Sequence, residues 1–430
     1  MAATGALVSE KTEGDQDVSV WKSEQPFPVA GFNFGKFKGQ STKLEKPPYD
    51  VEAYANQELP ADIQALQAYA EGTLPGRHAV PGLALGTMTT TGMVKRAMAE
   101  GELAIQLYSD YFGPTPFHRL AMTQQTAFGY GQSWPDLVWL PITYFYDSTI
   151  RHQLGMDDPH AYFKVVAPHE VAHQWWGHTI GFNSYRDQWM SEGFADFSAA
   201  LYLQVIYAKE PQQYMQFWQD ERKLLLERDK EGFRAIDAGP LIMGYRMSNS
   251  RTGFSLTRRL IYPKGAYVLH MLRQMMWDRH TGDQNFKAMM HDFVSTYSGK
   301  AASTEDFQAM VEKHMTPDMQ AVSDGKMNWF FDEYVYGTAL PSYQMDSRFE
   351  KNSEGDVVLK FKLAQSNVDE RFRMLVPVYL ELASGRVINL GHARLIGNTS
   401  LEQEIPIKGL KDAPQRAMVN YYDDVLCSDK

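Results

Sequence analysis

The stretch from Val165 to Phe197, VVAPHEVAHQWWGHTIGFNSYRDQWMSEGFADF, constrains this chain more than any other part of it. His169 and His173 are spaced so that on a helix they lie one turn apart on the same face and can reach the same metal ion. Glu170 follows the first histidine, and its carboxylate would approach the metal's open position without binding the metal. A general base that activates water occupies such a position. The pattern therefore predicts a helix that carries a catalytic metal site.

A third protein ligand has to come from another segment, and Glu192 is the candidate. It lies in WMSEGFADF, an apolar run with helical spacing, and a polar, glycine-containing turn separates this run from the histidines. Two antiparallel helices would bring Glu192 beside His169 and His173. Two imidazoles, one carboxylate and one open position are typical of catalytic zinc sites. Asp196, one turn further on, is a candidate acceptor for the ring N–H of a zinc-binding histidine.

These segments resemble a known family. HEVAHQWWGH and DQWMSEGFADF, with eighteen residues between His173 and Glu192, are similar to the gluzincin metallopeptidases of the aminopeptidase N family, which also includes a leukotriene epoxide hydrolase. The resemblance extends from about Val94 to Tyr343. It implies a Zn²⁺ cofactor, about one ion per chain, bound by two histidines and a glutamate in the usual way of catalytic zinc. The matching residues are His169, His173 and Glu192 as ligands and Glu170 as general base.

A second motif adds a residue to the expected site. The segment IYPKGAYVLHMLR is similar to the family's Tyr-x-Lys-Gly segment, whose tyrosine stabilises the tetrahedral intermediate. The matching residue is Tyr262, and we expect it at the start of a long apolar helix that begins near Pro263. The resemblance therefore implies two catalytic residues, Glu170 and Tyr262.

The chain departs from the family's pattern at two places. His178 stands where the family usually has Asp or Asn. We expect it at the surface or behind the ligands, because a fourth ligand would fill the open position. The family also holds the substrate's free amine with a Glu in a Gly-x-Met-Glu-Asn segment, but the matching place here reads GYGQSWPDL and has Gln132 without a carboxylate. This difference predicts weak dependence on a free N-terminus.

Composition limits the partners. The chain has 430 residues, 44% of them hydrophobic, with a net charge of −10 and a pI near 5.7. It has no basic run or basic helix, which argues against nucleic acid or an anionic membrane as a partner. A single cysteine, Cys427, excludes an intramolecular disulfide. We expect a peptide substrate, no nucleic acid and no membrane for the chain as given.

The N-terminal sequence bears on location. Residues Met1–Val20 lack a basic start followed by an apolar core, so they are not a signal peptide as written. No run reaches the ~18 apolar residues that span a bilayer, so the chain reads as cytoplasmic. The resembled family, however, carries a large all-β domain before the catalytic domain. If the chain is a fragment of a longer protein, that protein's other segments are its partners, and the protein is membrane-associated or exported.

The hydrophobic periodicity divides the chain into three regions, and the expected fold class is α+β. Residues 1–58 are expected to be a disordered polar arm and the remnant of a β-domain. For residues 59–340 the periodicity predicts a small sheet, whose edge strand is Leu137–Ile142, followed by a helical bundle. The resemblance implies that these residues form a thermolysin-like zinc peptidase domain. Residues 341–430 show a spacing of two between strand-like segments, which predicts a small β-sandwich.

The expected function is zinc-dependent peptide hydrolysis, and the resemblance favours an aminopeptidase. Three alternatives stay open: an endopeptidase, a hydrolase of a non-peptide ligand such as an epoxide, and a catalytically inactive binding module. Glu170 argues against the binding module, because binding alone requires no general base.

Overall fold

The computed structural model describes residues 1–73, 78, 90–156, 162–248 and 255–428. It consists of two compact units. The first comprises Met1–Gly181, Ser198–Gln213 and Tyr297–Lys300, and the second comprises Phe182–Phe197, Tyr214–Thr296 and Ala301–Lys430. In the part of the chain that the structure describes, no helix is both long and apolar enough to cross a bilayer.

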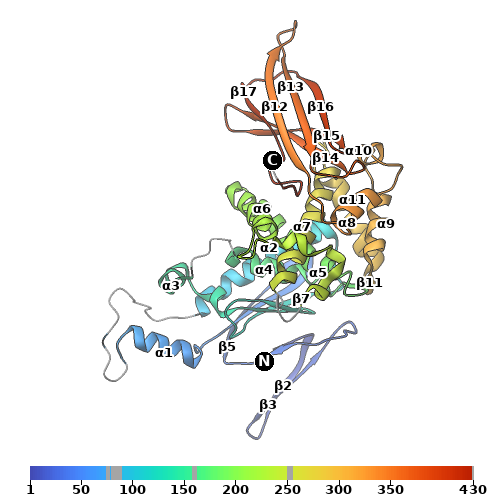
Figure 1. The fold of residues 1–430 in the computed structure, drawn as a ribbon. Coiled ribbons are helices and arrows are strands. Elements are labelled where there is room, and N and C mark those ends of the chain that lie inside the picture. The colour runs from blue at the N-terminus through green and yellow to red at the C-terminus, as the bar shows by residue number, and fades with distance from the viewer. Residues whose placement is uncertain (74–77, 79–89, 157–161, 249–254, 429–430) are drawn as a thin grey trace. The chain divides into compact units, whose positions relative to one another are not determined.

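A five-stranded sheet is the main β-structure of the first unit (Figure 1). The strands follow the order β5-β6-β7-β9-β8. The three inner strands run parallel, and the outer strands β5 and β8 run antiparallel to their neighbours. The strands are β5 (Phe37–Glu45), β6 (Pro48–Asn56), β7 (Arg119–Gln124), β8 (Gln132–Trp134) and β9 (Leu137–Leu140).

The position of one strand differs from the sequence prediction. We predicted an edge strand over Leu137–Ile142, but β9 ends at Leu140 and lies inside the sheet, between β7 and β8. Leu137, Val138 and Leu140 are completely buried, as expected for an internal strand that is covered on both faces. The edge on this side is β8, which begins directly after Gly131.

Two helices cover one face of this sheet. Helix α2 (Val94–Phe112) packs on β5, β6 and β7, α4 (Tyr162–Ala172) packs on β8 and β9, and the two helices pack on each other. Helix α2 ends before Gly113, whose φ of 89° favours glycine. This packing places the C-terminal end of α4 near β8. The shorter helical segments are α1 (Ala61–Ala70), η1 (Thr91–Met93), η2 (Ile142–Phe145) and α3 (Ser148–Gln153).

The prediction that the opening residues form a disordered arm was wrong. Strands β2 (Ala6–Glu13) and β3 (Gln16–Lys22) form a hairpin, and β1 (Ala2–Ala3) pairs with β4 (Phe32–Asn33). The Gly5 amide donates to the Asp136 carboxylate at 3.0 Å, and the Arg119 guanidinium donates to the Ala3 and Gly5 carbonyls. A polar composition does not reveal these contacts, because their partners lie more than a hundred residues away in the sequence.

The second unit contains most of the helices predicted after Glu192. Helix α7 differs from its prediction, because it begins at Ser255 and contains Pro263 in its interior. We expected a start near Pro263 because proline disrupts a helix interior. Leu260 and Ile261 are buried, so the first turns of the helix, before Pro263, are packed in the protein interior. The bounds are α5 (Trp189–Ile206), α6 (Pro211–Leu226), η3 (Ala235–Ala238), η4 (Leu241–Met247), α7 (Ser255–Met276), α8 (Gln284–Tyr297), α9 (Thr304–Lys313), α10 (Pro317–Ala321) and α11 (Asn328–Tyr334). Two short strands, β10 (Ile180–Phe182) and β11 (Lys300–Ala302), lie across the division between the units.

The C-terminal part of the second unit is made of two three-stranded antiparallel sheets. Their strand orders are β12-β13-β16 and β15-β14-β17. The change to a spacing of two after residue 341 predicted these strands, although β12 was not anticipated. The strands are β12 (Ser342–Lys351), β13 (Val357–Ser366), β14 (Arg373–Leu382), β15 (Val387–Ile396), β16 (Thr399–Ile407) and β17 (Pro414–Val419). The α+β class is confirmed.

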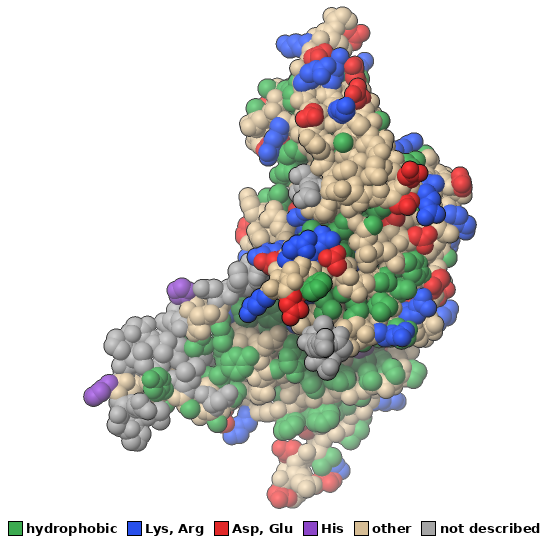
Figure 2. Space-filling view, in the orientation of Figure 1, with side chains coloured by type: hydrophobic (Ala, Val, Ile, Leu, Met, Phe, Trp, Pro, Cys, Tyr) green, Lys and Arg blue, Asp and Glu red, His purple; other side chains and the backbone are tan. Residues whose placement is uncertain are grey.

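The surface in Figure 2 shows acidic and basic side chains interspersed over the helices and the C-terminal strands. On this face neither sign gathers into one large patch.

Candidate metal centre

The two histidines of the predicted metal site lie at the C-terminal end of α4. His169 is in the last turn of the helix, and His173 follows Ala172, its last residue. The ring centroids are 4.8 Å apart, with the planes at 83°, and the two Nε2 atoms are 3.2 Å apart. Two nitrogens bound tetrahedrally to zinc at ~2.0–2.1 Å are separated by about 3.3 Å, so this spacing fits a shared zinc ion.

The other ring nitrogen of His173 has a partner of its own. Its Nδ1 lies 2.8 Å from the carbonyl oxygen of Trp176, so Nδ1 carries the hydrogen and donates it. The lone pair of this neutral tautomer is then on Nε2, the atom that faces His169. We had named Asp196 as a candidate acceptor for a zinc-binding histidine, but for His173 the acceptor is this backbone carbonyl. Such a hydrogen bond fixes the ring's orientation and tautomer.

The turn after α4 holds the Trp176 carbonyl in place. Gly177 has a φ of 120°, a conformation that favours glycine, and its amide donates to the Ile180 carbonyl at 2.8 Å. The indole N–H groups of both tryptophans are also used, Trp175 donating to the Gly113 carbonyl and Trp176 to the Ser198 hydroxyl. Both tryptophans therefore anchor the turn that follows His173.

Glu170 lies against the start of β8. Its side chain is 7% exposed, and a Cβ added to Gly131 would overlap the Glu170 carboxylate, with Oε1 as the nearest atom. The absence of a side chain at residue 131 thus allows the backbone to approach this carboxylate closely, and a larger residue would require the Glu170 side chain to shift. Periodicity of the sequence did not reveal this contact, but the isolated glycines of GYGQ before a short strand are a signal for close backbone approach.

In the second unit, a close crossing of α5 and α7 brings Glu192 and Tyr262 together. A Cβ on Gly193 would lie 2.5 Å from the Cα of Gly265, and a Cβ on Gly265 would lie 2.9 Å from the Cα of Gly193. The two glycines allow the helix backbones to touch. The residues beside them in sequence include Glu192 on α5 and, within the same turn, Tyr262 on α7. Glu192 and Tyr262 were predicted from the sequence, but the two glycines were not.

The environment of Tyr262 keeps its hydroxyl protonated. Burial raises the pKa of Tyr262 well above the usual tyrosine value, and the nearby carboxylates of Glu192 and Asp196 raise it further, as does a hydrogen bond to Glu192. Because a tyrosine of ordinary pKa near 10 is already protonated at neutral pH, Tyr262 is a hydrogen-bond donor there.

Among the described residues, His169, His173 and Glu192 form a group that can hold a metal ion. Each offers one ligand atom, and the three atoms lie within 4.8 Å of one another. All three side chains are half-buried. Two imidazole nitrogens and one carboxylate oxygen are a donor set that suits zinc and leaves a coordination position open. Glu170 is not part of this group.

His178 lies five residues after His173. Burial, together with a smaller effect of the nearby His173, lowers the pKa of His178 to about 3, and a hydrogen bond to the backbone of Ser133 opposes this shift. The ring is therefore neutral near pH 7. It is not among the three described residues whose ligand atoms lie within 4.8 Å of one another.

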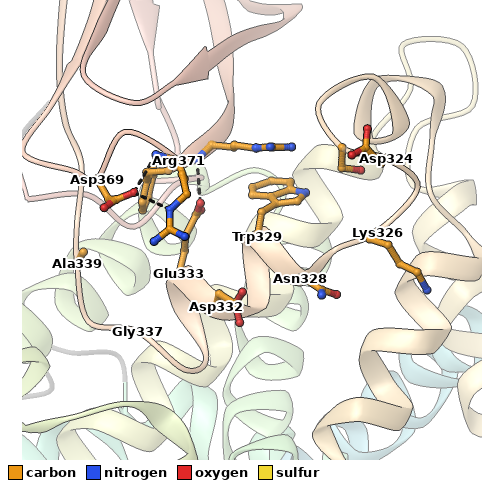
Figure 3. Close-up of a pocket in the computed structure, with 13 residues that line it drawn as sticks. Asp324, Lys326, Asn328, Trp329, Asp332, Glu333, Gly337, Ala339, Asp369 and Arg371 are labelled. Atoms are coloured by element: carbon orange, nitrogen blue, oxygen red, sulfur yellow. Dashed lines mark hydrogen bonds and ion pairs between the residues drawn. The ribbon is translucent and has the colours of Figure 1, made fainter.

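Two cavities lie away from these residues. One, of about 560 Å³, is in the second unit between α11 and the segment before β14, and Figure 3 shows Trp329, Asp332 and Glu333 on its helix wall. Burial raises the pKa of Glu333 there to about 9. The other, of about 660 Å³, is in the first unit, beside Trp134 and Trp139. Neither cavity is lined by a predicted site residue.

Comparison with known proteins bears directly on this site. Residues 140–334 match the sequence model of the peptidase family M1 domain. The chain is 27% identical over 223 residues to probable aminopeptidase 2 of Sulfurisphaera tokodaii, which covers 51% of this chain and 26% of that protein. It is 28% identical over 163 residues to the glutamyl aminopeptidase of Homo sapiens, which covers 37% of this chain and 16% of that protein. The crystal structure of Legionella pneumophila aminopeptidase A in complex with aspartic acid has a similar fold, with a TM-score of 0.59 at 14% identity, covering 100% of this chain and 43% of that one.

The matched segment contains His169, His173, Glu192 and Tyr262. The fold is similar to that of an aminopeptidase of known structure, and the donor set is one that suits zinc. Residues 140–334 are similar to the peptidase family M1 domain. The chain spans about a quarter or less of the length of these two curated relatives and 43% of the Legionella structure.

Proposed function

We propose that this chain is a zinc-dependent peptide hydrolase, and that aminopeptidase activity is its most favoured form. The observation that carries the proposal is the convergence of ligand atoms from His169, His173 and Glu192 to within 4.8 Å. Similarity to aminopeptidases along the M1 segment supports the choice of peptide bonds as the target.

The three proposed ligands contribute different charges to the metal site. His169 and His173 supply neutral nitrogens, and Glu192 supplies one negative charge, which leaves the site with a net positive charge when Zn²⁺ is bound. A zinc ion there would polarise the scissile carbonyl and lower the pKa of a water molecule toward ~7.

Glu170 is proposed as the general base. It lies on the same helix as His169 but outside the metal-binding group, so its carboxylate is available for proton transfer. It would take a proton from the attacking water and return it to the leaving amine. Its contact with the Gly131 backbone restricts where this carboxylate can move.

Tyr262 is proposed as the donor that stabilises the developing oxyanion. Its hydroxyl is protonated and lies near Glu192, so it is close to the position where a substrate carbonyl would approach the metal. Removing a donor of this kind typically costs ~2.7–4 kcal/mol of transition-state stabilisation.

One observation favours an endopeptidase as a second candidate. In the family an aminopeptidase glutamate binds the substrate's amine, and the matching segment here contains Gln132 at the start of β8. A neutral amide oxygen accepts a hydrogen bond from an ammonium group, but charged acceptors bind roughly twice as strongly. Recognition of the free amine is therefore proposed to be weak.

Removal and replacement of the metal test the proposal. The purified chain is treated with a zinc chelator, dialysed, and then supplied with Zn²⁺ or Mg²⁺, with cleavage of an unblocked peptide as the readout. We expect cleavage to disappear with the metal and to return with Zn²⁺ but not with Mg²⁺, which prefers oxygen ligands. Full cleavage by the metal-free chain would contradict the proposal.

A further inference from the structure

Gln174 follows the metal ligand His173 and is 1% exposed. Its side-chain oxygen accepts a hydrogen bond from the Asp136 amide at 2.8 Å. Its side-chain nitrogen donates to the Ser133 hydroxyl at 2.9 Å and to the Trp134 carbonyl at 3.0 Å. A buried amide that makes this many bonds to one segment holds that segment firmly, because breaking any of them leaves a buried polar group unsatisfied.

All three partners of Gln174 belong to the edge of the sheet. Ser133 and Trp134 are in β8, and Asp136 is in the turn that joins β8 to β9. His178 contacts the same strand through its hydrogen bond to the Ser133 backbone. Two residues of the segment that follows α4, Gln174 and His178, therefore form hydrogen bonds to β8.

The start of β8 is also the place where Glu170 is confined. A Cβ at residue 131 would lie 2.3 Å from Oε1 of Glu170 and 2.6 Å from its Cδ and Cγ, so the backbone before β8 packs closely against this side chain. A shift of β8 relative to α4 would therefore change the space that the carboxylate occupies. The hydrogen bonds of the Gln174 side chain connect the segment after α4 to β8.

We propose that Gln174 is a positioning residue, which fixes edge strand β8 against α4 and so holds Glu170 in its catalytic position. This inference rests on the proposed function, because it assigns Glu170 a role in catalysis. The Gln174 side chain contacts β8 and the turn after it, so its proposed effect on Glu170 is indirect.

The first test replaces the amide by an apolar side chain of similar length, Gln174→Met. We expect the zinc content to stay at the wild-type level and kcat for peptide cleavage to fall roughly 10- to 100-fold, because a displacement of about 1 Å can cost 10²-fold. The matched control is Gln365→Met. Gln365 is also buried and hydrogen-bonded, to the Gly397 carbonyl and the Tyr343 hydroxyl, but it lies in β13 of the C-terminal sheets. Gln365→Met should lower stability and leave kcat unchanged.

A double-mutant cycle with Ser133→Ala tests whether Gln174 acts through β8. Ser133→Ala alone removes one of the three bonds and should lower kcat a few-fold. In the Gln174→Met background the same change should have almost no further effect, because the bond is already absent. Additive effects of the two substitutions would overturn the inference.

Hydrogen exchange supplies a readout that does not depend on activity. The Asp136 amide, which donates to Gln174, should exchange faster in Gln174→Met than in the wild type, while exchange in β13 stays the same. Unchanged exchange at Asp136, or loss of zinc from Gln174→Met, would overturn the inference. If the wild-type chain cleaves no peptide, the proposed function fails, and the exchange result still decides whether Gln174 holds β8.

Discussion

At the scale of single residues, the tautomer of His173 determines which of its nitrogens can bind a metal. Donation from Nδ1 to the Trp176 carbonyl leaves the Nε2 lone pair facing His169. Glu170, one residue after His169, is excluded from the metal-binding group and is confined by Gly131. Binding and proton transfer are thus expected to be separable by mutation.

Zinc content tests the assignment of ligands. Replacing His169, His173 or Glu192 by alanine should lower bound zinc sharply from about one ion per chain, because two remaining protein ligands bind far more weakly than three. The control is His118→Ala, since His118 is exposed and pairs with Glu24. Metal analysis of the purified variants provides the measurement. Wild-type zinc content in His173→Ala would refute the assignment.

Tyr262→Phe tests the proposed oxyanion donor. The change removes a hydroxyl and little volume, so folding and zinc content should survive while kcat falls roughly 10²–10³-fold with a small change in KM. Tyr267→Phe is a matched control on the same helix, because the Tyr267 hydroxyl donates to the Trp218 carbonyl at 2.9 Å. This control should lower the free energy of unfolding and preserve kcat. An unchanged kcat in Tyr262→Phe would assign Tyr262 a structural role.

The sequence revealed those residues of the site whose chemistry is distinctive. The spacing of His169, Glu170 and His173 on one helix is a local property, so it could be read directly. The Trp176 carbonyl could not be anticipated, because a backbone group carries no sequence signal. Gln174 was equally hidden, since its partners in β8 become neighbours only after the sheet forms.

At the scale of elements, the crossing of α5 and α7 depends on two glycines. In Gly265→Ala the added Cβ would meet the Gly193 Cα at 2.9 Å and the Trp189 carbonyl oxygen at 3.1 Å. Because both neighbours are backbone atoms, the helices must move apart. We expect the free energy of unfolding to fall by about 1–3 kcal/mol, as in overpacked cores, and kcat to fall with it.

The control for this substitution is Gly92→Ala, because a Cβ there would meet nothing within 4 Å. Urea unfolding and peptide cleavage are measured on both variants. Stability and kcat at the wild-type level in Gly265→Ala would show that the close crossing is not required.

Element boundaries were predicted less well than element types. The helices after Glu192 were found because their apolar spacing is long and regular. The start of α7 was misplaced because the interior proline, Pro263, was taken as a boundary. The interior position of β9 was missed because strand order depends on long-range pairing with β7, which periodicity does not encode.

At the scale of the whole molecule, the edge of the sheet bears on which peptides are cleaved. β8 carries Gln132 where the resembled family has a carboxylate, so we expect acetylation of a peptide's N-terminus to lower kcat/KM only weakly. Mass spectrometry of both digests measures the ratio. Complete loss of cleavage on acetylation would show that the free amine is required and that another group binds it.

The central claim is that a zinc-bound site in this chain hydrolyses peptides with Glu170 as the base. The most direct measurement is digestion of a defined peptide mixture by the zinc-loaded chain and by its Glu170→Gln variant, with mass-spectrometric mapping of the cut sites and metal analysis of both proteins. The account predicts equal zinc in the two proteins, cleavage by the wild type and almost none by the variant. No cleavage by the zinc-loaded wild type, or equal cleavage by both proteins, would contradict it.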